Sequence, residues 1–132
     1  MAEACLGGLH GRSVLLVGPE RLCRPYKALL QQAGIKAIYS EETSERLVAL
    51  LPQVQLFMHI PESSITGNTN ATPLITAAAI AQGCAGRRAP LVIFDLAESP
   101  SIEELAGLLP AVCLYTPDDL RAILAGYFMQ IA

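Results

Sequence analysis

The segment from Gly11 to Gly34 reads GRSVLLVGPERLCRPYKALLQQAG and sets the expectation for the whole fold. Ser13 to Val17 is a short apolar run of branched side chains, typical of a parallel strand buried on both faces. Gly18 and Pro19 end that strand. A helix is then predicted, because apolar residues recur every three or four positions, at Leu22, Tyr26, Leu29, Leu30 and Ala33. Gly34 is its expected C-terminal cap, and a strand, glycine turn and helix in this order open a nucleotide-binding βαβ unit.

Strand and helix patterns alternate along the rest of the chain. The predicted strands are 35–39, 54–60, 90–96 and an edge-like 112–115, and the predicted helices are 43–51, 74–82, 101–109 and 117 to near the end. Such alternation with short links predicts a mostly parallel sheet with helices on both faces, a Rossmann-like three-layer α/β/α fold. We expect residues 1–132 to form a single domain, with residues 1–10 as a loose N-terminal lead.

Two helix boundaries carry explicit signals. Thr43 is a candidate N-cap for the helix that buries Leu47, Leu50 and Leu51 and that Pro52 ends. Thr116, followed by proline and two aspartates, combines a capping hydroxyl, proline at the first helical position and early negative charge. The polar segment 61–73 is the longest irregular stretch, and loops of that length are usually functional or mobile.

Composition excludes several classes of protein. Hydrophobic residues make up 52% of the chain, yet no apolar run approaches the about 18 residues of a membrane span. The net charge of −3, without a basic stripe, argues against nucleic-acid binding. Cys5, Cys23, Cys84 and Cys113 lie far apart, so we expect no metal site and reduced thiols. With no secretory leader pattern at the N-terminus, we expect a cytoplasmic protein.

Right-handed crossovers would gather the strand ends at one edge of the sheet, where such folds bind ligands. The candidate binding residues are Gly18, Pro19, Arg21, Leu22, Glu41, Thr43, Ile60 and Asp95. Alternatives stay open for several of them. Glu20 and Glu41 are ligand contacts or solvated acids, and Arg21 holds an anion or lies on a solvated helix face. Asp95 lines a site or caps the turn that follows it, and His59 is an isolated residue near a buried strand end.

Two segments resemble the nucleotide-binding domain of the glutamyl-tRNA reductase family. The first is the opening strand, LHGRSVLLVG at 9–18. The second begins with APLVIFDLA at 89–97 and continues with LPAVCLYTPDDL at 109–120, where that family has Asp-Ile-Ala and then Gly-Val-x-Leu-Tyr-x-x-Asp-Asp-Leu. The resemblance extends from about Leu9 to Leu124. It implies a Rossmann fold, binding of NAD or NADP and a place in tetrapyrrole biosynthesis.

Departures from that family affect its chemistry. The family's catalytic cysteine has no counterpart in context here, so no catalytic residue is carried over. Its Gly-Ala-Gly-Glu-Met-Gly falls on residues 18–23, which keep only Gly18 and place Glu20 and Cys23 at the other two glycines. Its Asn-Arg-Thr, which favours a 2′-phosphate, falls on Glu41-Glu42-Thr43, so NAD is favoured over NADP if a dinucleotide binds.

Three functional hypotheses follow. The first is a non-catalytic, degenerate Rossmann-like domain that acts by self-association, as a homodimer, or by binding a tetrapyrrole-pathway enzyme. The second is an NAD(P)-binding oxidoreductase component completed by another chain. The third is that an anion or other small ligand replaced the dinucleotide. No cofactor is certain under any of them.

Overall fold

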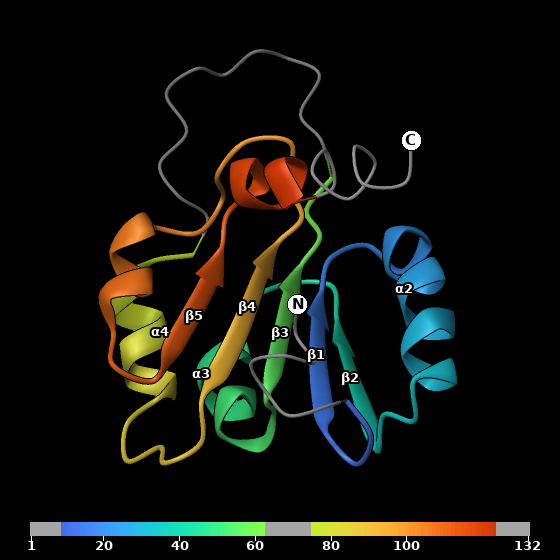
Figure 1. The fold of residues 1–132 in the computed structure, drawn as a ribbon, viewed down its shortest axis with the longest axis horizontal. Coiled ribbons are helices and arrows are strands. Elements are labelled where there is room, and N and C mark those ends of the chain that lie inside the picture. Colours follow the sequence, from blue (N-terminus) through green and yellow to red (C-terminus); the bar gives the residue numbers. More distant parts are fainter. Residues whose placement is uncertain (1–8, 63–74, 124–132) are drawn as a thin grey trace.

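The computed structural model describes residues 9–62 and 75–123. Its centre is a five-stranded sheet in the order β2-β1-β3-β4-β5, in which every neighbouring pair is parallel (Figure 1). The strands are β1 (Ser13–Val17), β2 (Ala37–Glu41), β3 (Leu56–His59), β4 (Leu91–Asp95) and β5 (Val112–Tyr115). The chain direction across the sheet reverses between β1 and β3, so the topological switch point lies at the ends of these two strands.

Helices cover both faces of the sheet. They are α2 (Glu20–Gln32), α3 (Leu47–Leu50), α4 (Ala77–Gly83), the 3₁₀ helices η1 (Leu51–Gln53) and η2 (Glu104–Leu108), and residues 117–123. Two separate cores result. Val14 and Leu16 of β1 pack with Cys23 and Leu30 of α2, while alternate strand residues pack on the other face against α3, α4 and η2. The Rossmann-like α/β fold predicted from the sequence is therefore confirmed.

The strand predictions hold for four elements and need a shift for one. β1 and β5 have the predicted bounds, and β3 and β4 lie within theirs. The second strand begins at Ala37, not at residue 35, and continues to Glu41. The reason is the end of α2: Gly34 is left-handed (φ 83°), and the Ile35 amide donates back to the Leu30 carbonyl. These residues therefore complete a helix cap before the strand can start.

The helices α2 and α3 begin at different residues from those predicted. α2 begins two residues early, at Glu20, and contains Pro25. The helix expected from residue 43 begins only at Leu47, because Thr43 accepts a bond from the Glu45 amide in a separate turn. Pro52 lies inside η1 and does not end the helical segment, although Leu47, Leu50 and Leu51 are buried as predicted.

Two helices on the other side of the sheet are shorter than predicted. Residue 75 is extended because the Ile75 amide donates to the Ser101 carbonyl and the Ile75 carbonyl accepts from the Glu103 amide. α4 therefore starts after Thr76, whose hydroxyl accepts from the Ala79 amide. The same pairing holds residues 101–103 extended, so η2 begins at Glu104 and not at residue 101.

Thr116 caps the last helix as predicted. Its hydroxyl accepts from the Asp119 amide at 3.1 Å, and its own amide donates to the Asp119 carboxylate at 2.9 Å, a reciprocal capping box. The continuation of that helix beyond residue 123, most of the polar segment 61–73 and residues 1–8 of the expected lead lie outside the described residues. Within the described part, no helix is long and apolar enough to cross a membrane.

Candidate functional site

Gly18 brings the ends of β1 and β3 into close contact at the switch point. Its amide donates to the Glu41 carbonyl at 2.9 Å, and the Ile60 amide donates to the Val17 carbonyl at 2.8 Å. The φ angle of Gly18 is 155°, and a β-carbon on this residue would lie 2.0 Å from the Ile60 carbonyl oxygen. Only glycine fits between the two strand ends, so Gly18 shapes the edge of the sheet where a ligand is expected.

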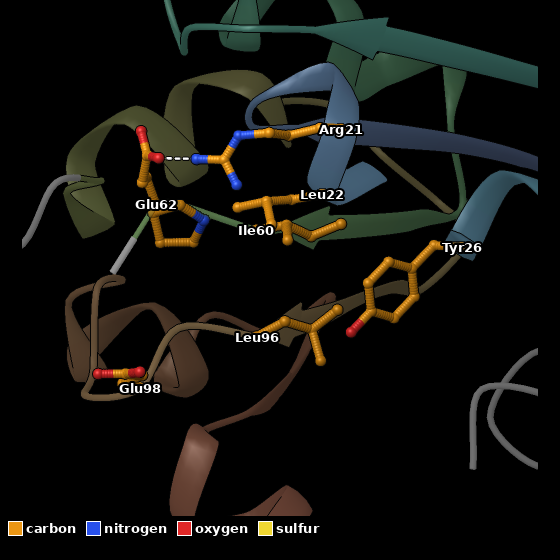
Figure 2. A pocket seen from close by; sticks show the side chains of 8 residues that line it. Arg21, Leu22, Tyr26, Ile60, Glu62, Leu96 and Glu98 are labelled. Atoms are coloured by element: carbon orange, nitrogen blue, oxygen red, sulfur yellow. Dashed lines mark ion pairs between the residues drawn. The ribbon is translucent and has the colours of Figure 1, made fainter. Parts of the chain in front are cut away.

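A cleft of about 490 Å³ opens beside this switch point (Figure 2). Its apolar residues come from α2 and from the segments after β3 and β4: Leu22, Tyr26, Ile60, Pro61 and Leu96. Its charged residues are Arg21, Glu62 and Glu98. The volume and the mixture of apolar floor and few polar groups are within the range of small-molecule sites.

The charge of the cleft is negative on balance. Arg21 forms an ion pair with Glu62, both side chains being more than half exposed. Figure 2 shows the guanidinium turned toward that carboxylate at one end of the cleft. None of the ion pairs in the described part of the chain involves the carboxylate of Glu98. The cleft therefore presents one paired cation and two carboxylates.

The turn between β1 and α2 carries side chains at positions where a phosphate-binding turn has glycines. Pro19 precedes α2 and provides no side-chain cap. Glu20 occupies the first helical position and pairs with Lys27 at 2.7 Å, a hydrogen bond that lowers the pKa of Glu20. Cys23 is fully buried between α2 and the sheet, and burial raises the pKa of its thiol. At the second and third glycine positions of a dinucleotide-binding turn, this chain thus has a surface acid and a core residue.

The end of β2 is engaged in local contacts. The Glu41 carboxylate pairs with Arg46 at 3.1 Å, and the Thr43 hydroxyl accepts from the Glu45 amide at 3.5 Å. Neither residue is among those that line the cleft. In this structure both stabilise the turn that leads from β2 to α3.

Asp95 belongs to a buried network on the α4 face of the sheet. Its carboxylate accepts from the Ser101 hydroxyl at 2.6 Å, the Ser101 amide at 2.7 Å and the Ile102 amide at 3.1 Å. The Ser101 hydroxyl in turn lies 2.7 Å from Nδ1 of His59. Because the hydroxyl donates to the carboxylate, Nδ1 of His59 donates to the hydroxyl oxygen, and burial lowers the pKa of the imidazole. The network joins the ends of β3 and β4 to the segment before η2.

Three of the eight predicted site residues line the cleft, namely Arg21, Leu22 and Ile60. Gly18 and Pro19 form the adjacent turn, whereas Glu41, Thr43 and Asp95 have the contacts described above. Sequence reasoning missed Tyr26, Pro61, Glu62, Leu96 and Glu98 as lining residues. The sequence pattern placed Tyr26 on the buried face of the helix, and nothing in the sequence distinguished Ser101. Tyr26 lines the cleft with residues from other connections, and Ser101 links His59 to Asp95, so both positions depend on segments distant in sequence. Among the described residues no group of histidine, cysteine or acidic side chains could hold a metal.

Comparisons with known proteins point to one family. No protein-family model matches the chain. It is 30% identical to glutamyl-tRNA reductase of Methanospirillum hungatei, over 93% of this chain and 33% of that protein. It is also 30% identical to glutamyl-tRNA reductase of Methanocella arvoryzae, over 93% of this chain and 31% of that protein. The chain therefore spans about a third of the length of these curated relatives.

The solved structures show the same relationship at the level of the fold. Glutamyl-tRNA reductase from Methanopyrus kandleri superposes with a TM-score of 0.74 and 24% sequence identity. The match covers 98% of this chain and 36% of that one. The resemblance found in the sequence is therefore confirmed over nearly the whole chain.

Proposed function

We propose that this chain, which resembles glutamyl-tRNA reductases over 93% of its length, is a Rossmann-like module. It acts by binding another protein chain and not by dinucleotide chemistry. Its partner is a second copy of the chain or an enzyme of tetrapyrrole biosynthesis. The chain keeps the sheet, the switch point and the close turn at Gly18, but its phosphate-binding turn is altered.

The observation that carries this proposal is the position of Glu20. It is the first residue of α2, where a bound pyrophosphate would meet the free amides of the helix N-terminus. A carboxylate at this position disfavours a phosphate group, although its ion pair with Lys27 offsets part of the negative charge.

Cys23 supports the same conclusion from the other side of α2. Its side chain is completely buried and packs in the core between helix and sheet. The third glycine of a dinucleotide-binding turn lets the helix approach the strand closely, and a thiol at that position occupies this space. Residue 23 therefore serves core packing, and the third glycine of the fingerprint is absent.

Calorimetric titration of the full chain with NAD, NADH, NADP and NADPH at near-physiological salt tests the proposal. We expect no heat of binding from any of the four. Light scattering on the same sample should give a mass above the 14.0 kDa of one chain if self-association is the mode of action. Micromolar binding of one dinucleotide would overturn the proposal.

A gain-of-function variant sharpens this test. Glu20→Gly places a glycine at the second position of the turn and removes the negative charge, at the cost of the exposed Lys27 pair and some helix propensity. We expect binding of a dinucleotide to become measurable in this variant. Glu104→Gly is the matched control, because this exposed acid begins η2 and does not line the cleft. Equal behaviour of the two variants would show that Glu20 does not block the site.

A second candidate function is a dinucleotide-binding oxidoreductase component completed by a catalytic segment from elsewhere. Gly18 favours it, since this glycine and the cleft beside it lie where Rossmann folds bind dinucleotides. The same titration decides between the two functions. Gly18→Val is unsuitable as a probe of this site, because its side chain would collide with the Ile60 backbone and perturb the fold.

A further inference from the structure

We infer that the cleft beside the switch point binds an organic cation carried on an apolar body, such as an alkylammonium or guanidinium group. The inference rests on the proposed function, since a dinucleotide would occupy the same space. It concerns what the cleft accepts once phosphate is disfavoured.

The apolar part of such a ligand has a defined place. Leu22 and Ile60 lie in the middle of the cleft, with Leu96 facing them from the segment after β4 (Figure 2). The Tyr26 ring lies toward one end. Burial of an aliphatic or aromatic stem among these side chains is favourable at about 25 cal/mol per Å² of apolar surface. The cleft is thus more than a group of surface acids.

The charged part of the ligand would lie at the opposite end. Glu62 and Glu98 both lie toward that end in Figure 2, away from Tyr26. Arg21 already places a guanidinium on Glu62, which shows that this end accommodates a planar cation. The carboxylate of Glu98 forms none of the ion pairs seen in the described residues, because the neighbouring Arg121 guanidinium donates to the Glu98 backbone carbonyl, at 3.1 Å, and pairs with Asp118. A ligand cation can therefore contact this carboxylate.

Charge selects between otherwise similar ligands. An anionic ligand would meet a net negative lining and would have to compete with Glu62 for Arg21. A cationic ligand gains from Glu98 immediately and from Glu62 whenever Arg21 turns away. Because both carboxylates are at an exposed rim, each contributes modestly and is screened by salt, so the apolar stem provides most of the affinity.

Two probes of equal size and opposite charge test the inference: 4-phenylbutylamine and 4-phenylbutyric acid, titrated into the ¹⁵N-labelled full chain and followed by NMR. We expect the amine to shift the amide signals of Leu22, Ile60 and Leu96 with a dissociation constant on the order of 0.1 to 1 mM. The acid should bind at least about fivefold more weakly. Equal binding of amine and acid, or amine-induced shifts elsewhere, would overturn the inference.

Substitutions of the charged residues at the exposed end of the cleft test which of them contribute to amine binding. Glu98→Gln should weaken amine binding about threefold to fivefold, and Glu104→Gln, remote from the cleft lining, should leave it unchanged. Arg21→Gln should strengthen it about threefold by releasing Glu62. A purely structural role for these exposed residues would not give effects of opposite sign, so an unchanged affinity in both rim variants contradicts the inference.

Two further measurements identify the source of the cation and distinguish failure of this inference from failure of the proposed function. A short peptide with one lysine between leucines carries the same ammonium group, and tighter binding of the peptide than of the amine identifies a partner protein as the source. Tighter binding of the amine identifies a free small molecule. Displacement of the amine by NADH would refute the proposed function, whereas failure of the amine to bind without any dinucleotide binding would refute only this inference.

Discussion

At the scale of single residues, the edge of the sheet depends on a few side chains with strict requirements. Gly18 is needed for space and conformation, and Cys23 fills the contact between α2 and the sheet. Asp95 satisfies three donors within residues 101–102 and leaves no buried polar group of this network unpaired among the described residues. These residues support the structure beside the cleft, whereas the side chains that line the cleft are partly or fully exposed apart from Ile60.

Replacement of Gly18 by alanine should destabilise the fold. The new β-carbon would lie 2.0 Å from the Ile60 carbonyl oxygen, and the φ angle of 155° is unfavourable for an L-residue. We expect a loss of about 3 kcal/mol in the free energy of unfolding, measured by urea denaturation.

Gly86→Ala is the matched control for that measurement. Gly86 also has a positive φ, 73°, but a β-carbon there would meet nothing within 4 Å. Its cost should therefore be the backbone term alone, about 1 kcal/mol. Equal losses in the two variants would show that the contact with Ile60 relaxes freely.

The buried His59 predicts a pH dependence of stability. Burial lowers the pKa of its imidazole below the ordinary value, although the Asp95 carboxylate partly opposes this effect. As pH falls through about 6.5, the unfolded chain takes up a proton before the folded chain does. The free energy of unfolding should therefore fall between pH 7 and pH 5, by at most about 1.4 kcal/mol per pH unit for this group.

Urea unfolding of the unmodified chain and of His59→Gln at several pH values measures this contribution. Glutamine does not titrate, so the slope between pH 7 and pH 5 should decrease in the variant. An identical slope in both proteins would assign the pH dependence to other groups.

At the scale of elements, the residue at which a helix begins depends on both local signals and tertiary contacts. The Thr116 capping box forms as the sequence indicates, because all of its partners lie within four residues. The start of α4 moves to residue 77 because Ile75 pairs with a segment 27 positions away in the sequence, around Ile102. The Thr116 boundary was thus predictable from nearby residues, whereas the start of α4 depends on a distant backbone partner.

Pro25 within α2 provides a test at this scale. A proline inside a helix cannot donate to the carbonyl four residues earlier, and the Pro25 side chain is exposed, so it gains little packing in return. We expect Pro25→Ala to raise the free energy of unfolding by about 1 kcal/mol, the restored bond and helix propensity outweighing the greater entropy of the unfolded chain.

Pro100→Ala is its control. Pro100 is exposed and lies outside the helices, so no intrahelical bond is lost there. This substitution should be neutral or slightly destabilising in thermal or urea unfolding. Stabilisation by Pro100→Ala, or none by Pro25→Ala, would contradict the argument from the missing hydrogen bond.

At the scale of the whole molecule, the two ends of the sheet have different roles. The carboxyl end carries Gly18, the cleft and the network of Asp95. The opposite end is held by Arg87, whose guanidinium donates to the Leu51 carbonyl at 3.0 Å and to the carbonyls of Val54, Ala89 and Pro90. One side chain thus joins η1, the approach to β3 and the turn before β4.

The sequence by itself determined the fold class and the positions of four of the five strands. Buried parallel strands require continuous apolar runs, and helices require their own periodicity, so both patterns are visible in a single chain. The resemblance to glutamyl-tRNA reductases was likewise carried by local motifs around residues 9–18 and 89–120.

Only the tertiary structure decided the composition of the site. The cleft combines Leu22 and Arg21 from α2 with Glu62 and Glu98 from two other connections, and the buried network joins His59 to Ser101 across 42 residues. Sequence spacing does not encode which side chains meet when crossovers fold back onto a sheet. The charge of the cleft and the hydrogen bonds of the buried network depend on which side chains come into contact, so only the tertiary structure shows them.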